Sequence, residues 1–444
     1  MTASPPPSVP RDWPPGAVDL LLPRAPLGLP LPAYEGRSLP NVAASVALAL
    51  GATPSPASLG PLAPAVDPFH GRRADGPVLL FVVDGFGYGL LRRRASRPDG
   101  ATAGRWLART APLTSVFPTT TTAALTSLAT AAPPSRHGVV GYRQFLPRFG
   151  SVVDVLRMSP YGVSTPETLV GPSWSREELV GAPTIYRSGA AGAVALSREE
   201  FVGRGFTRVL YDAAAFEGYW SWSDMAAALV RLLGREPPPP LVVAYWDELD
   251  TIEHLRGPAD PSVELEVDRL LAFVEFVARG VGPRLARATT VLVTADHGLV
   301  PADPARQVAV DTAPGLVARL ARPPTGDRRA AFLKARPGEL AALRRDLDQR
   351  LPEGARVLTR EEALGHGLFG PPPYHAELDE RVGDLVVLVP SPSGVTYTLP
   401  GRARERRELL GAHGGLEAEE LVVPLVAAAL EDLGRDASDA TPKG

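Results

Sequence analysis

The chain has 444 residues, with 46 Lys or Arg, 49 Asp or Glu and a formal net charge of −3. This near-neutral balance argues against a basic surface, so we expect no nucleic-acid polymer and no membrane as a partner. The sequence contains no cysteine, which excludes disulfides and thiolate ligands and leaves His, Asp, Glu and hydroxyl oxygens for any metal site.

Residues 1–74 form a Pro-rich N-terminal extension. Its first residues, "MTASPPPSVPRDWPPG", lack the basic and apolar regions of a signal peptide, and no apolar run approaches the ~20 residues of a membrane-spanning helix. We therefore expect a cytoplasmic protein. Within the extension, "NVAASVALALG" (41–51) predicts a short helix.

Three apolar, β-branched runs predict buried strands: Val78–Val83 and the runs within 240–250 and 289–299. Amphipathic patterns at 223–234 and 262–280 predict helices between them. Buried strands that alternate with helices indicate an α/β fold with a largely parallel sheet covered on both faces.

The rest of the chain suggests an interruption of this core. We expect residues 75–315 to form the first part of the core and residues 316–380, which include the charged amphipathic pattern 338–351, to form a small inserted cap. An apolar run within 381–434 predicts a strand that returns the chain to the core. Residues 435–444 read as a disordered tail.

Acidic residues follow each of the three predicted strands. Asp84 follows the first, Asp247, Glu248 and Asp250 follow the second, and Asp296 follows the third. Because ligands bind at the carboxyl ends of strands in open parallel sheets, we expect these acids to meet at one edge. Facing carboxylates repel one another unless cations neutralise them, so the pattern indicates a cation site.

Three of the seven histidines fit the same site. His254 lies four residues after Asp250, which places both side chains on one helix face, and His297 directly follows Asp296. His413 is flanked by glycines that permit a tight turn. With Asp84 these groups make six nitrogen and oxygen ligands, enough for two divalent ions that would clamp a phosphoryl group.

The stretch "SVFPTTTTAALTSLATAAPPSRHG" (115–138) contains four consecutive threonines before a helical pattern. Threonine is a favoured N-cap, and a helix N-terminus attracts phosphate. One hydroxyl of the run, activated by a metal ion, would be a strong nucleophile. Spacing alone disfavours only Thr119, next to Pro118, and leaves the other three open.

Five segments together resemble the alkaline phosphatase superfamily and, within it, the type I phosphodiesterase/nucleotide pyrophosphatase family. They are "VVDGFG", "SVFPTTTTAALTSLATAAPPSRHGVVGY", "YWDELDTIEHLRGP", "VLVTADHG" and "GAHGG". They span residues 78–415 in the order of the family. The resemblance implies a three-layer α/β/α alkaline phosphatase-like core with a mostly parallel sheet and a small inserted cap.

The resemblance also implies site residues. One zinc ion would be held by Asp84, Thr121, Asp296 and His297, and a second by Asp250, His254 and His413. Thr121, three residues after Pro118, would be the nucleophile. Its alkoxide would attack phosphorus to give a covalent phospho-threonine, which a zinc-bound hydroxide would hydrolyse. The expected partner is a small-molecule phosphoester.

The sequence departs from the family at Ala124, which stands where nucleotide pyrophosphatases have an Asn that contacts a phosphate oxygen. That contact is missing or is supplied elsewhere. A phosphomonoesterase or a phosphonate hydrolase with the same metals is therefore an alternative. A non-catalytic protein that binds a phosphorylated ligand is a weaker alternative, because no nucleophile or ligand of the motif has been lost.

Overall fold

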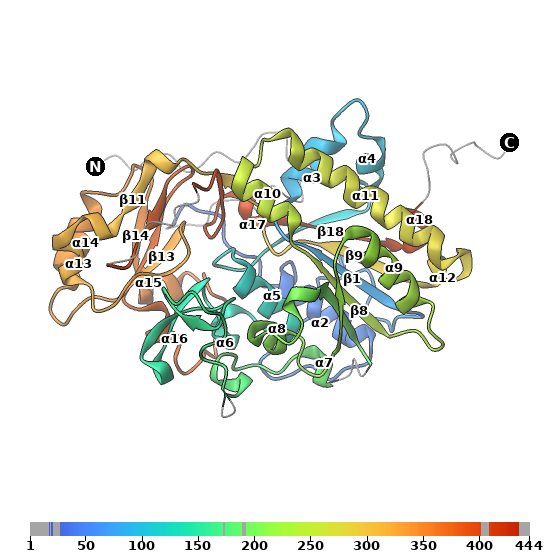
Figure 1. Ribbon diagram of the computed structural model, residues 1–444, viewed down its shortest axis with the longest axis horizontal. Helices are drawn as coiled ribbons and strands as arrows, with labels where there is room; N and C mark the ends of the chain where they lie inside the picture. The colour runs from blue at the N-terminus through green and yellow to red at the C-terminus, as the bar shows by residue number, and fades with distance from the viewer. Residues whose placement is uncertain are drawn as a thin grey trace.

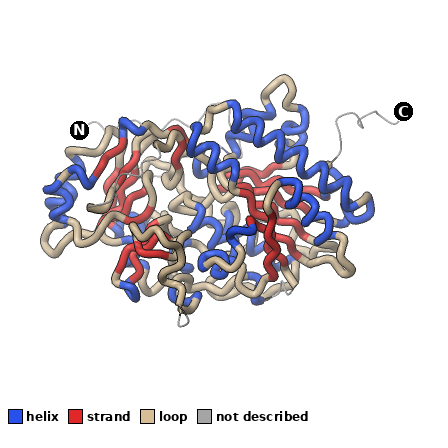
Figure 2. Tube along the Cα trace, in the orientation of Figure 1, coloured by secondary structure: helices blue, strands red, loops and turns tan. Residues whose placement is uncertain are grey.

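The computed structural model describes residue 17, residues 19–20, 27–171, 174–188, 192–400 and 408–434, and the fold is drawn in Figures 1 and 2. The tail expected at 435–444 and most of the first 26 residues lie outside this part of the chain, so their predictions stay untested.

The larger of two sheets has seven strands in the order β2-β18-β9-β1-β8-β6-β7. Five neighbours from β9 to β7 pair in parallel, and β18 runs antiparallel to both β9 and β2. The three strands predicted from apolar runs are confirmed as β1, β8 and β9. The seven strands are β1 (Val78–Val83), β2 (Thr110–Thr114), β6 (Val194–Arg198), β7 (Ala215–Tyr219), β8 (Leu241–Trp246), β9 (Thr290–Thr294) and β18 (Val422–Ala429).

Every residue of β1 and β8 is buried, because both faces of the sheet are covered by helices. One layer contains α3 (Tyr88–Ala95), α4 (Ala101–Leu107), α9 (Trp222–Leu233), α11 (Pro261–Val281), α12 (Pro283–Ala288) and α18 (Leu430–Leu433). The other layer contains α2 (Leu39–Ala49), α5 (Thr121–Thr130), α7 (Ile185–Ser188) and α8 (Gly205–Leu210). Figure 1 shows the two groups on opposite sides of the sheet. The predicted α/β/α core is confirmed, as are the helices expected at 41–51, 223–234 and 262–280.

No helix within the described ranges is long and apolar enough to cross a membrane.

The second sheet has the order β14-β15-β13-β12-β3-β4-β5, and its pairs are antiparallel. It lies beside the core in Figure 1 and packs its own apolar clusters. The predicted helix at 338–351 is α14 (Leu340–Asp348), and α15 (Arg360–Gly365) follows β14. The strands are β3 (Arg143–Leu146), β4 (Ser151–Asp154), β5 (Ser159–Pro160), β12 (Thr325–Gly326), β13 (Ala330–Leu333), β14 (Arg356–Thr359) and β15 (Leu385–Leu388).

One strand prediction was wrong. We expected the apolar run after residue 381 to rejoin the core sheet, but its strand β15 pairs with β13 and β14 in the second sheet. The return strand is β18 instead. The reason is that β15 is buried over its whole length, so its composition matches a core strand and does not reveal its partners. The second sheet also takes residues 143–160, outside the predicted cap at 316–380.

Candidate active site

The acidic residues after β1, β8 and β9 meet at the carboxyl edge of the core sheet. Val83 pairs with Trp246 across β1 and β8, and Val82 pairs with Thr294 across β1 and β9, so the three strands end at one level. The backbone N–H of Asp84 donates to the Trp246 carbonyl at 2.8 Å. Parallel pairing therefore places residues separated by more than 200 positions at one edge.

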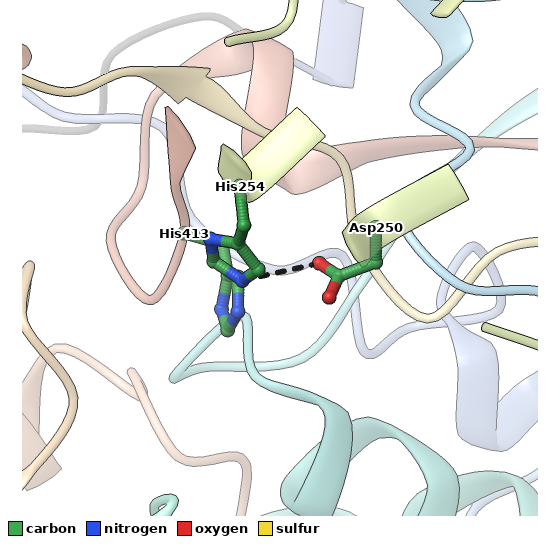
Figure 3. A group of neighbouring side chains, drawn as sticks. All are labelled: Asp250, His254 and His413. Atoms are coloured by element: carbon green, nitrogen blue, oxygen red, sulfur yellow. Dashed lines mark ion pairs between the residues drawn. The ribbon is translucent and has the colours of Figure 1, made fainter. Parts of the chain in front are cut away.

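One group of close side chains comes from α10 (Glu248–Arg256) and from the segment after β17 (Gly411–Ala412). Asp250 and His254 lie one turn apart on α10, with 3.3 Å between Asp250 Oδ1 and His254 Nε2. His413 follows β17, which pairs with β10 (Val300–Pro301) just beyond β9. One ligand atom from each of the three residues lies within 4.8 Å of the others. Figure 3 shows the three side chains and the contact between Asp250 and His254.

A second group surrounds the Nε2 atom of His297. This nitrogen lies 3.6 Å from Asp84 Oδ1 and 3.4 Å from Asp296 Oδ2. Asp84, Asp250 and His297 also offer ligand atoms within 4.8 Å of one another, so Asp250 takes part in both groups. The imidazoles of His297 and His413 stack with their centroids 3.8 Å apart, which joins the two groups into one centre.

Thr121 completes the set. It is the first residue of α5, and its hydroxyl oxygen lies 3.2 Å from His297 Nε2. Thr120 holds the N-cap position but does not cap the helix with its side chain, and the hydroxyl of Thr122 is buried with no partner among the described residues. Of the three threonines that spacing leaves open, only Thr121 directs its hydroxyl to the cluster of acids and imidazoles.

The loop before α5 is tied to the loop that carries His413. The Thr119 hydroxyl donates to the Gly415 carbonyl at 3.0 Å and accepts from the Gly414 N–H at 2.9 Å. Gly414 has φ +115°, and a Cβ there would lie 2.8 Å from that of Asp327. A glycine is therefore needed for the loop to reach the site.

The residues fit divalent cations by two independent criteria. Asp84 Oδ1, Asp250 Oδ1 and Asp296 Oδ2 are buried and have no hydrogen-bond partner in the described part of the chain. Three unpaired carboxylate oxygens around one point are costly unless a cation binds them. His254 Nδ1 donates to the Gly411 carbonyl at 2.8 Å and His413 Nδ1 donates to the Thr119 carbonyl at 2.9 Å, because carbonyls only accept. Both Nε2 atoms are thus left with the lone pair that a metal needs.

Burial dominates the electrostatics of the site in the absence of cations. It raises the pKa of Asp84 well above its ordinary value, with Asp296 and Asp250 raising it further. Burial also raises the pKa of Asp296 to about 7. For the imidazoles burial acts in the other direction and lowers the pKa of His297 to about 3 and that of His413 well below its usual range. Neutral imidazoles are the form that binds metal.

Two residues of the site escaped the sequence analysis. Tyr245 is the penultimate residue of β8, and its phenol donates to Asp84 Oδ2. Asp327, in the turn after β12, accepts from the Thr120 hydroxyl at 2.8 Å and lies 3.8 Å from His413 Nδ1. A buried tyrosine within a strand and an aspartate in a Gly-Asp turn carry no distinctive spacing, so no sequence signal pointed to either.

The remaining acids after β8 lie outside the cluster. Asp247 and Glu248 form ion pairs with Arg198 at 2.5 and 2.9 Å, respectively. These contacts account for both carboxylates without a metal, so of the acids after β8 only Asp250 joins the candidate ligands.

A cavity of about 400 Å³ opens onto the centre, and its lining includes Thr121, Asp250, His254, Asp327 and His413. A substrate therefore has access to the candidate nucleophile and to one of the two ligand groups from the same space.

A mostly parallel sheet covered on both faces, with carboxylates and imidazoles at its carboxyl edge, gives the chain an alkaline phosphatase-like fold. The model of one family, described as type I phosphodiesterase/nucleotide pyrophosphatase, matches residues 78–416. The chain belongs to this family, and it is a hydrolase of the phosphodiesterase type.

Solved structures support the fold. Murine ectonucleotide pyrophosphatase/phosphodiesterase 5 shares 20% identity, with a TM-score of 0.58 over 79% of this chain and 87% of that chain. An inactive threonine-to-alanine variant of the murine protein, in complex with AMP, gives 20% identity and a TM-score of 0.57 over the same shares. Human ectonucleotide pyrophosphatase/phosphodiesterase 5 shares 18% identity, with a TM-score of 0.57 over 79% of this chain and 87% of that chain. No curated protein sequence matches the chain.

Proposed function

We propose that the protein is a phosphodiesterase that uses Thr121 as its nucleophile and two zinc ions as cofactors. One ion would be held by Asp84, Thr121, Asp296 and His297, and the other by Asp250, His254 and His413. The observation that carries the proposal is the position of the Thr121 hydroxyl, 3.2 Å from an imidazole nitrogen that also lies within 3.6 Å of two carboxylates.

The reaction would run in two displacements. The Thr121 hydroxyl gives up its proton, and its oxygen forms a bond to phosphorus while the bond to the leaving oxygen breaks. The leaving oxygen departs with the electron pair and takes up a proton. Water then attacks the phospho-threonine, so that the phosphate monoester is released and the Thr121 hydroxyl is restored. When bound, the zinc ions would lower the pKa of the hydroxyl and offset the charge on the phosphoryl oxygens.

The protein's own groups position these events. The helical spacing of Asp250 and His254 on α10 and the carbonyl contacts of His254 and His413 fix the directions of the imidazoles. Asp327 holds the side chain of Thr120, the residue before the nucleophile. The first N–H groups of a helix have no acceptor within the helix, so the N-terminal turn of α5 can donate them to a phosphoryl oxygen. This contact would replace the one expected of an Asn at position 124.

Ala124 itself is fully buried in the core, so that position contributes no group to the site. A diester is favoured over a monoester because a second cavity also reaches Thr121, which gives each of two substituents its own space. The threonine-to-alanine change that inactivates the murine relative supports the choice of a threonine nucleophile, and its AMP complex supports a small phosphoester as the substrate. The cytoplasmic location stays a prediction.

The test combines metal content with turnover. We expect zinc-replete protein to hydrolyse bis(4-nitrophenyl) phosphate faster than 4-nitrophenyl phosphate, and a chelator to abolish turnover until zinc is added back. Turnover that resists the chelator would contradict the metal assignment, and a preference for the monoester would favour the phosphomonoesterase.

A further inference from the structure

We propose that the substrate carries an alkyl or aryl substituent and that this group binds an apolar cavity beside Thr121. The inference rests on the proposed function and adds the chemical class of one substituent. Its basis is the second cavity at the nucleophile, which differs in chemistry from the cavity that contains the candidate metal ligands.

The apolar cavity has a volume of about 310 Å³, at the small end of the range of ligand pockets. Its walls include Leu125 of α5, Phe206 and Leu210 of α8, Tyr245 of β8, and Leu156. Thr121 is part of the same lining. An apolar substituent that moves from water into this space would lie beside the hydroxyl that attacks phosphorus. Its transfer out of water is favourable.

The walls connect directly to the candidate metal centre. The ring of Tyr245 lines the cavity while its phenol donates to Asp84 Oδ2. On the other side, Leu125 lies one helical turn after Thr121. The distance from the cavity to a phosphorus atom held at Thr121 is therefore short enough for a group attached directly to the phosphate.

Leu156 marks the entrance. It is 39% exposed, and it lines both the apolar cavity and the cavity that contains His254 and His413. A substituent that entered past Leu156 would cover this exposed surface.

Three of the four charged side chains of the lining are engaged with the protein itself, and the fourth, Glu200, belongs to an exposed residue. Glu167 accepts from the Gly205 N–H at 2.8 Å, Arg204 donates to the Glu200 carbonyl at 2.9 Å, and Arg157 donates to the Ser164 carbonyl. Two arginines and two glutamates leave this lining without formal net charge. The cavity therefore does not select for a second anionic group.

The cavity on the metal side is different in kind. Its lining contains Arg143, Arg328, Asp250 and Asp327 together with two histidines. We therefore assign the polar or charged substituent of a diester to that side, and the alkyl or aryl group to the apolar cavity. The described lining of the apolar cavity includes neither Asn nor Gln, the side chains best suited to pair with the edge of an adenine base.

The test uses alkylphosphonates, in which the apolar group is bonded directly to phosphorus. Calorimetry on the zinc-loaded protein would give Kd for methyl-, propyl-, hexyl- and phenylphosphonate and for AMP, with phosphate release checked to exclude C–P cleavage. We expect affinity to rise about fourfold per methylene until the cavity is filled. Phenylphosphonate should bind more tightly than AMP.

A variant locates the effect. Thr207 lines the cavity from α8 and is partly exposed, so Thr207→Phe should fill the cavity and reduce the hexyl-to-methyl affinity ratio at least tenfold. The neighbouring Arg208 is exposed and outside the lining, so Arg208→Phe is the matched control and should keep the ratio. Leu156→Asp, at the exposed entrance, should also reduce the ratio and does not disturb the core.

The outcomes separate the two proposals. If methylphosphonate binds and longer chains bind no better, or if AMP binds more tightly than phenylphosphonate, the cavity assignment is overturned and the proposed function stands. If no phosphonate binds to the zinc-loaded protein, the proposed function fails, and the inference that rests on it fails as well.

Discussion

The Nε2 atom of His297 lies 3.2 Å from the hydroxyl oxygen of Thr121, although 176 residues separate them in the chain. The contact joins the end of β9 to the start of α5. It also distinguishes Thr121 from its neighbours, because the Thr120 hydroxyl donates to Asp327 and that of Thr122 is buried without a partner among the described residues. The predictions below start from this contact.

Thr121→Ala should reduce kcat for bis(4-nitrophenyl) phosphate by at least about 10³-fold, because without this nucleophile no covalent phospho-threonine can form. Thr122→Val is the matched control. It replaces a hydroxyl that has no partner in the described part of the chain by a methyl group of similar shape, so kcat should change by less than about threefold. A larger loss in Thr122→Val than in Thr121→Ala would show that the nucleophile has been misassigned by one residue.

The purified zinc-replete protein should contain two zinc ions per chain by elemental analysis. His254→Ala should reduce this to one, because the group with Asp250 and His413 loses a ligand while the group around His297 keeps all of its own. His366→Ala, a partly exposed position at the end of α15, should leave the content at two. An unchanged zinc content in His254→Ala would exclude that residue as a ligand.

Tyr245→Phe should weaken zinc binding by about 10- to 100-fold, the usual effect of losing a hydrogen bond to a metal ligand. The lost contact is the one from the phenol to Asp84 Oδ2, and the ring stays in place. Tyr219→Phe is the control, since its phenol donates to the Tyr245 carbonyl at 3.0 Å and not to a candidate ligand. Competition with a fluorescent chelator gives both affinities, and equal values would contradict the role of Tyr245.

The metal-free protein should lose stability as the pH rises from about 6.5 to 8. Burial raises the pKa of Asp84 well above its ordinary value and that of Asp296 to about 7. The folded state therefore keeps protons that the unfolded state, with aspartate pKa values near ~3.9, has already released. The slope is about −1.4 kcal/mol per pH unit for each proton that the folded state retains.

The buried histidines act in the opposite direction, but only at lower pH. The lowered pKa values of His297 and His413 make stability rise with pH until about 6.5, where unfolded histidine becomes neutral. Urea unfolding of chelator-treated protein at pH 6.5, 7.25 and 8 tests the prediction. Asp84→Asn should flatten the slope, and a metal-free protein that gains stability over this range would refute the assignment.

Much of the fold could be predicted from local patterns. The apolar run Val78–Val83 predicted a buried strand, and every residue of β1 is buried. The helical periodicity predicted at 262–280 is found in the 21 residues of α11. Leu385–Leu388 shows where this reasoning ends. Its burial pattern is the same as that of a core strand, but it pairs with β13 and β14 in a second sheet. No local pattern in the sequence predicts this pairing.

The site divides in the same way. The order of acids after strands and the Asp250–His254 spacing place the candidate ligands, because parallel strands share one carboxyl edge and a helix repeats every 3.6 residues. Tyr245 and Asp327 were found only in three dimensions, since their roles depend on contacts with Asp84 and Thr120 across 161 and 207 residues.

The sequence by itself determined which functional groups are available: carboxylates, imidazoles and four consecutive threonines, without thiols. It also predicted a parallel sheet whose carboxyl edge brings the acids together. Only the tertiary structure decided which threonine hydroxyl reaches His297 and how Thr121 lies between a polar and an apolar cavity. The physical reason is that residue type and periodicity fix the face on which a side chain lies. Distances between elements, and the spaces left between them, depend on how the whole chain packs.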